Sequence, residues 1–153
     1  MKKPIAIIAG EPNSINTEII AKAWKKNKIF KNLFIVGNYS LIKKQIIKLG
    51  FSIPLIKISK FKDFKRENRL IVLDVPIKFK QIFDVNSSEV RTHIFKCLDI
   101  VHQLAIKKKI IGFINAPIDK KIFNNKYLGL TEYLSKKNKS KNNEVMMIYN
   151  KKL

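Results

Sequence analysis

The chain has 153 residues, of which 46% are hydrophobic, so it suits a single domain with a packed core and is too apolar for a disordered chain. Its net charge is +21, and nearly all of the excess comes from lysines spread along the sequence. Because base recognition favours grouped arginines, we do not expect a nucleic-acid partner. A lysine-rich nucleic-acid-binding protein remains an alternative interpretation.

Other function classes are disfavoured by the composition. No apolar run approaches the roughly 18 residues of a membrane-spanning helix, so we expect a cytoplasmic protein without a membrane partner. Cys97 is the single cysteine, which excludes a disulfide within the chain and a Cys-x-x-Cys metal site. His93 and His102 are nine residues apart and would point to different sides of a helix. We therefore predict no metal site formed by this chain alone.

The predicted elements alternate between strands and helices. In chain order they are a buried strand at 4–9, a helix at 17–27, a strand at 33–37, a helix at 39–49 that Gly50 ends, and a strand at 53–59. They continue with a strand at 70–75, a helix at 86–108, a strand at 110–116, a short helix at 131–137 and a final strand at 144–150. This order predicts one α/β unit over residues 1–153, with helices on both faces of a parallel or mixed sheet.

Ligands bind at the carboxyl ends of the strands in such sheets, so the turns that follow strands are the candidate sites. The first is Gly10-Glu11-Pro12, which leads to a helix that Asn16 or Thr17 could cap. A dinucleotide site needs several glycines at this turn, and only Gly10 is present. On spacing alone, a plain strand–helix turn is the favoured interpretation.

Two later turns carry candidate binding residues. Asn115 lies at the end of the strand at 110–116 and Lys120 follows it, and a lysine at a strand end can hold a phosphate or polarise a carbonyl. The alternative is a turn capped by Asp119 beside a solvated lysine. In the stretch 127–138, Gly129 allows an unusual backbone angle, and Thr131 could cap a helix while presenting its hydroxyl to a ligand.

These motifs, in this order, resemble the 4-hydroxythreonine-4-phosphate dehydrogenase family of pyridoxal phosphate biosynthesis. They are Gly-Glu-Pro at 10–12, Ala-Pro-Ile-Asp-Lys at 116–120, Gly-Leu-Thr-Glu at 129–132 and Val-Met-Met at 145–147. The resemblance covers the N-terminal part of the family. It implies a three-layer α/β/α fold similar to isocitrate and isopropylmalate dehydrogenases, truncated in this chain.

The resemblance also implies an activity: oxidation of 4-phosphohydroxy-L-threonine with NAD or NADP and a divalent metal such as Zn, Mg or Co, in a homodimer. By this resemblance Thr131 binds the substrate, and Lys120, Asn115 and Glu11 are candidate substrate-binding residues. It identifies no catalytic or cofactor-binding residue in the chain. The family's three metal-binding histidines fall beyond residue 153, so we expect dehydrogenase activity only together with a C-terminal half.

Several positions depart from the family pattern. Leu130 stands where the family has a histidine, Ser14 and Asn16 replace glycines of the first turn, and Asp119 stands where Asn or His is common. Leucine cannot donate a hydrogen bond to a substrate. A catalytically inactive remnant that binds a phosphorylated metabolite therefore remains a second alternative.

Overall fold

The computed structural model describes residues 3–26, 32–123, 127–139, 145 and 147. It forms two compact units, Met1–Ile118 and Asp119–Leu153. The single unit expected over residues 1–153 stays a prediction. Within the described residues, no helix is long and apolar enough to cross a membrane.

The first unit contains the alternating strands and helices that the sequence predicts. Their bounds are β1 Ile5–Ile8, α1 Asn16–Lys26, β2 Leu33–Gly37, α2 Tyr39–Lys48, β3 Leu55–Ile58, η2 Phe61–Asp63, β4 Leu70–Asp74, α3 Ser87–Ile106 and β5 Gly112–Asn115. Gly50 follows α2 with a φ of 75°, as expected for the residue that ends a helix. Asn86 caps α3 by accepting from the Ser88 amide.

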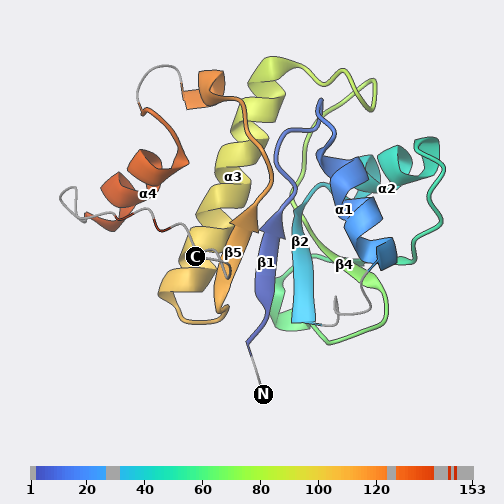
Figure 1. The fold of residues 1–153 in the computed structure, drawn as a ribbon, viewed down its shortest axis with the longest axis horizontal. Coiled ribbons are helices and arrows are strands. Elements are labelled where there is room, and N and C mark those ends of the chain that lie inside the picture. Colours follow the sequence, from blue (N-terminus) through green and yellow to red (C-terminus); the bar gives the residue numbers. More distant parts are fainter. Residues whose placement is uncertain (1–2, 27–31, 124–126, 140–144, 146, 148–153) are drawn as a thin grey trace, which may run out of the picture. The chain divides into compact units, whose positions relative to one another are not determined.

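The five strands form one parallel sheet in the order β3-β4-β2-β1-β5. Figure 1 shows α3 behind the sheet next to β5, and α1 in front of the sheet next to β2. Helix α2 packs with α1 on that front face, because Ile42 and Ile46 share a core cluster with Ile20 and the strand residue Ile35. This arrangement confirms the predicted α/β/α layers.

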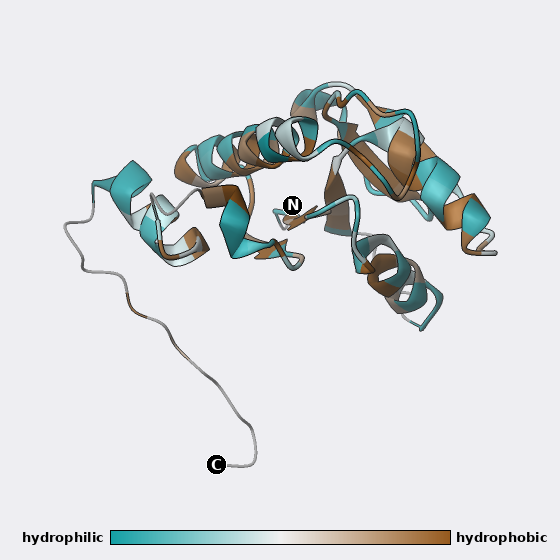
Figure 2. Ribbon diagram, turned by 90° about the horizontal axis from the view of Figure 1, so that it is seen from above, coloured by the Kyte–Doolittle hydropathy of each residue, from teal (hydrophilic) through white to brown (hydrophobic). Residues whose placement is uncertain are grey.

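The central strands are buried on both faces, as the nearly continuous apolar runs predict. Ile7 and Ile35 face α1 and α2, whereas the alternate residues Ile8 and Phe34 face α3. Beside α3, Phe34 also contacts Phe61 and Phe64, with ring centroids 5.5 and 5.4 Å away. In Figure 2 the strands are mainly hydrophobic and the helices carry both colours, as expected for helices with one face on a core.

The second unit contains η3 Lys120–Phe123 and α4 Leu130–Asn138. A cluster of three aromatic rings stabilises it: Tyr127 contacts Tyr133 at 5.4 Å between centroids, and Phe123 lies 6.0 Å from Tyr133. The predicted helix at 131–137 is thus present. The predicted strand at 144–150 lies outside the described residues except for positions 145 and 147.

Candidate functional site

The loop after β1 is closed by its own hydrogen bonds. The Ser14 amide and hydroxyl both donate to the Glu11 carbonyl, at 3.3 and 2.7 Å, and the Asn16 amide donates to the Ser14 hydroxyl at 3.2 Å. Asn16 is the first residue of α1, so neither Asn16 nor Thr17 is its N-cap and that prediction was wrong. The amides of Ser14 and Asn16 are therefore not free to hold a pyrophosphate.

Gly10 makes room for a close contact between the loop after β1 and the segment after the neighbouring strand β5. Asn16 is 1% exposed, and its Nδ2 donates to the Pro117 carbonyl at 2.8 Å. Gly10 has a φ of 74°, and a Cβ placed on it would lie 2.4 Å from Asn16 Nδ2 and 2.9 Å from the Pro117 oxygen. Gly10 therefore allows the loop after β1 to pack closely against the segment after β5, and this contact leaves no role for the glycine in binding a phosphate.

A buried polar network holds this loop against α2. The Gln45 side chain is 1% exposed, donates to the carbonyls of Pro12 and Ile82, and accepts from the Thr17 hydroxyl. Asn13 exchanges two hydrogen bonds of 2.8 Å with the backbone of Val85. The loop is therefore held by hydrogen bonds to α2, to the segment at 82–85 and to the segment after β5. No sequence pattern marks Gln45 as part of such a network, because it simply occupies a position on the apolar stripe of a helix.

Two buried acceptors remain at the ends of β1 and β5. Asn115 is the last residue of β5 and pairs in register with Ile8 of β1. Asn115 Oδ1 and Asn16 Oδ1 are buried without a hydrogen-bond partner among the described residues. Buried polar atoms are normally paired, so each of these oxygens could accept from a ligand that carries N–H or O–H groups. Asn16 was not predicted as a site residue, because its position reads as a helix cap.

The four predicted substrate-binding residues fall in both units. Glu11 and Asn115 belong to the first unit, where they follow or end the neighbouring strands β1 and β5. Lys120 is exposed at the start of η3, and Thr131 is half-buried in the first turn of α4, both in the second unit. The convergence of all four on one ligand stays a prediction.

The local structure around Lys120 and Thr131 refines the sequence interpretation. Asp119 Oδ1 accepts from the Lys121 amide at 2.9 Å, which is the capped turn considered as the alternative for this segment. Gly129, rather than Thr131, occupies the N-cap position of α4, so the predicted cap was wrong. The φ of Gly129 is 179°, which is ordinary extended backbone rather than the unusual angle expected. The Thr131 hydroxyl is consequently not committed to capping.

His93 and Cys97 form a buried pair on α3. Cys97 Sγ lies 3.6 Å from His93 Nε2, and the two residues are 2% and 4% exposed. Burial raises the pKa of Cys97 to about 12 and lowers the pKa of His93. Both groups are thus held neutral, so the pair packs as core and does not provide a thiolate nucleophile.

The described residues do not fit a divalent metal ion. Within the described part of the chain, no three His, Cys, Asp or Glu side chains gather in a group that could bind one. An open groove of about 470 Å³ lies beside α3, and none of the four predicted residues lines it. Its walls include Phe61, Leu73, Asp99 and Leu104, so it belongs to the β3–β4 side of the sheet rather than to the ends of β1 and β5.

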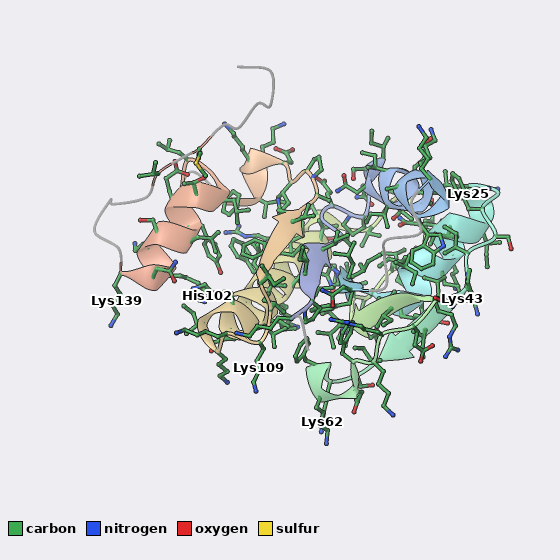
Figure 3. All side chains as sticks on the ribbon, turned by 60° about the horizontal axis from the view of Figure 1, so that its bottom comes forward. Lys25, Lys43, Lys62, His102, Lys109 and Lys139 are labelled. Carbon is green, nitrogen blue, oxygen red and sulfur yellow. The ribbon has the colours of Figure 1, made fainter. Side chains whose placement is uncertain are left out.

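The lysines do not gather on one face of the first unit. Figure 3 shows Lys25 on α1, Lys43 on α2, Lys62 on η2 and Lys109 after α3, each pointing outward from a different element. Several lysine ammonium groups lie over aromatic rings, as Lys25 Nζ does at 5.0 Å from the centroid of the Phe51 ring. This dispersal favours a solvated coat over a single nucleic-acid-binding stripe.

A family model supports the sequence resemblance. The model of the pyridoxal phosphate biosynthetic protein PdxA matches residues 29–153, a range that contains Lys120 and Thr131 but not the loop after β1. A curated relative, 4-hydroxythreonine-4-phosphate dehydrogenase of Caulobacter vibrioides, is 26% identical over 121 residues. The alignment covers 77% of this chain and 35% of that enzyme.

Solved structures share the fold. A putative 4-hydroxythreonine-4-phosphate dehydrogenase from Salmonella typhimurium matches with a TM-score of 0.75 and 22% identity, over 89% of this chain and 44% of its own. The enzyme of the same name from Burkholderia phymatum matches with a TM-score of 0.76 and 18% identity, over 89% and 43%. The chain thus spans less than half the length of these relatives.

Proposed function

Because the chain belongs to the PdxA family of pyridoxal phosphate biosynthetic proteins, we propose that it provides the N-terminal part of an NAD(P)-dependent 4-hydroxythreonine-4-phosphate dehydrogenase. The observation that carries the proposal is the family match over residues 29–153, which includes the segments of Asn115, Lys120 and Thr131. The reaction would oxidise the secondary hydroxyl of 4-phosphohydroxy-L-threonine by transfer of a hydride to the nicotinamide.

The chain's own residues would bind and orient the substrate. The exposed Lys120 ammonium suits the phosphate or carboxylate of the substrate. Thr131, whose hydroxyl is not needed as a cap, can donate or accept a hydrogen bond. The unpaired Asn115 Oδ1 can accept from a substrate ammonium or hydroxyl group. Leu130 offers no such bond, so Thr131 would act there without the neighbouring histidine of the family.

The metal ion and most of the nicotinamide site would come from the remaining part of the enzyme. A divalent ion supplies Lewis-acid polarisation of the reacting oxygen in this chemistry. The described residues do not fit such an ion, and the loop after β1 uses its amides internally. We therefore assign this chain the binding of the substrate's polar groups and no proton or hydride transfer.

Substrate binding by the chain alone tests this assignment. Calorimetry with 4-phosphohydroxy-L-threonine should show saturable binding, which Lys120→Ala weakens and Lys121→Ala, the exposed neighbouring lysine, leaves unchanged. Nicotinamide reduction should be at background for the chain alone and should appear when the C-terminal part of the Caulobacter enzyme is added with a divalent metal. Turnover by the chain alone, or equal effects of the two lysine substitutions, would refute the assignment. Saturable binding with no turnover in the mixture would instead identify an inactive remnant.

A further inference from the structure

The open groove beside α3 belongs entirely to the first unit. Its apolar lining comes from Phe61 of η2, Leu73 of β4, and Ile100 and Leu104 of α3. Ile100 and Leu104 are four residues apart, so they lie one above the other on the same face of the helix. The volume of about 470 Å³ lies within the range of about 300–1,000 Å³ that small-molecule sites occupy. The groove therefore has the size and the apolar lining of a ligand site.

The wall formed by η2 is held in place by aromatic packing. Phe61 and Phe64 stack on each other with ring centroids 6.0 Å apart, and both rings contact Phe34 of β2. Phe34 is fully buried under this pair. The Phe64 amide also donates to the Phe61 carbonyl at 3.0 Å, which closes the turn. The groove is thus formed by the fold of the first unit itself and needs no ligand to shape it.

Polar side chains with free donors also line the groove. Lys60 and Lys107 are exposed, and among the described residues neither ammonium group has an ion pair or a hydrogen bond. Gln103 lines the groove as well and stands four residues before Lys107, on the same face of α3. Gln103 and Lys107 can therefore donate together to one acceptor group at the C-terminal end of the helix.

Two carboxylates line the groove, but they do not cancel the charge near Lys107. Asp74 Oδ2 already forms a 2.8 Å ion pair with Lys57, and Asp74 Oδ1 accepts from the Tyr39 amide at 2.8 Å. Asp99 stands eight residues before Lys107 on α3, about 12 Å along the helix axis, which exceeds the Debye length of about 8 Å in physiological salt. The end of α3 contributes only about half a unit of negative charge. The groove near Lys107 is therefore positive.

We propose that this groove binds an amphipathic carboxylate, that is, a hydrocarbon chain of medium length that ends in a carboxylate. The hydrocarbon would lie along α3 against Leu73, Ile100 and Leu104, where burial of apolar surface favours binding. The carboxylate would accept from the Lys107 ammonium and the Gln103 amide. This site goes beyond the proposed function, because none of the four predicted substrate-binding residues lines the groove.

A segment of a longer polypeptide is the competing occupant. More than half of the Salmonella protein lies outside the region aligned with this chain. An apolar helix or strand would cover Leu104 without any need for the charges of Lys60 and Lys107, whereas a carboxylate pairs with them. The charge of the groove thus favours the small anion, and the two occupants give different results in the test.

Calorimetry of the intact chain with decanoate should show saturable binding of one molecule per chain. Decanol, which has the same hydrocarbon without the charge, should bind more weakly. Leu104→Trp, which fills the groove, should weaken decanoate binding about tenfold or more, and Leu104→Ala, which removes part of the wall, should weaken it less. Lys107→Ala should weaken binding about twofold to fivefold, as expected for an exposed ion pair.

Two matched controls use residues that do not line the groove. Ile106→Trp lies on the same helix and replaces a side chain that is 60% exposed, and Lys62→Ala removes an exposed lysine of η2. Both variants should bind decanoate as the unchanged chain does. Circular dichroism melts of all variants check that the fold is intact.

Four results would overturn the proposal. They are no saturable binding of decanoate, equal binding of decanol and decanoate, equal effects of the groove variants and their controls, and binding of the C-terminal part of the Caulobacter enzyme that Leu104→Trp weakens. The last result would show that a polypeptide occupies the groove. Decanoate binding with the expected losses would support the site whether or not the chain contributes to dehydrogenase activity, so the two proposals fail separately.

Discussion

Replacement of Gly10 by alanine should destabilise the fold strongly, because the residue combines a left-handed backbone with a crowded surrounding. Its φ is 74°, a conformation that costs an L-residue about 1–2 kcal/mol. The new Cβ would lie 2.4 Å from Asn16 Nδ2 and 2.9 Å from the Pro117 oxygen, so the Asn16 side chain must move. That movement breaks the Asn16–Pro117 hydrogen bond and leaves a buried amide unpaired, at a cost of about 1–3 kcal/mol.

Gly50 provides a matched control within the same chain. Its φ is 75°, nearly equal to that of Gly10, but a Cβ placed on it meets nothing within 4 Å. Gly50→Ala should therefore cost only the backbone part, about 1–2 kcal/mol, whereas Gly10→Ala adds the second cost and should reach about 2–5 kcal/mol. Against a typical total stability of about 5–15 kcal/mol the difference is large.

Urea unfolding followed by circular dichroism measures both free energies of unfolding under the same conditions. A third variant, Gly10→Ala with Asn16→Ala, removes the nearest obstacle and should be more stable than the sum of the two single effects predicts. If Gly10→Ala and Gly50→Ala cost the same, the close packing at the ends of β1 and β5 does not govern stability. The reasoning about this site would then be refuted.

Three further predictions concern buried polar groups. Gln45→Ala should lower the free energy of unfolding by about 2–4 kcal/mol in urea titrations, because the carbonyls of Pro12 and Ile82 lose their donor. A loss of only about 0.3 kcal/mol would show that this network does not stabilise the fold. Cys97 should resist a thiol reagent at about pH 8 in the native chain and react in urea, since burial raises its pKa to about 12; rapid native labelling would disprove this. Burial also lowers the pKa of His93 from 6.5, so below that pH the unfolded chain binds the extra proton and the free energy of unfolding should fall. His93→Gln should flatten this part of the pH profile, and an unchanged profile would argue against it.

The sequence was sufficient for the elements because their signals are local. Runs such as Leu33–Gly37 and Leu70–Asp74 are almost wholly apolar, and at this length that pattern is typical of a buried parallel strand. Cys97 lies on the buried apolar stripe of α3. His93 lies four residues earlier on the same stripe and is buried as well. A histidine does not by itself predict burial, because its side chain is polar.

The site was harder to predict because it depends on contacts between distant residues. The Asn16–Pro117 hydrogen bond joins residues 101 positions apart, and no periodicity reports such a pair. The position of β4 between β2 and β3 is equally absent from local patterns. For Thr131, the residue type suited a helix cap, but Gly129 takes that position because α4 begins earlier than predicted.

The strand order determines which strand pairs of the sheet can form first during synthesis. Strand β1 can pair with β2 once residues 33–37 have been synthesised, but its other side must wait for residues 112–115. Pairs so distant along the chain form slowly, because a long loop must close before they gain any energy. On the ribosome, the side of β1 that pairs with β5 is thus open until about three-quarters of the 153 residues have been made, which gives chaperones time to bind there.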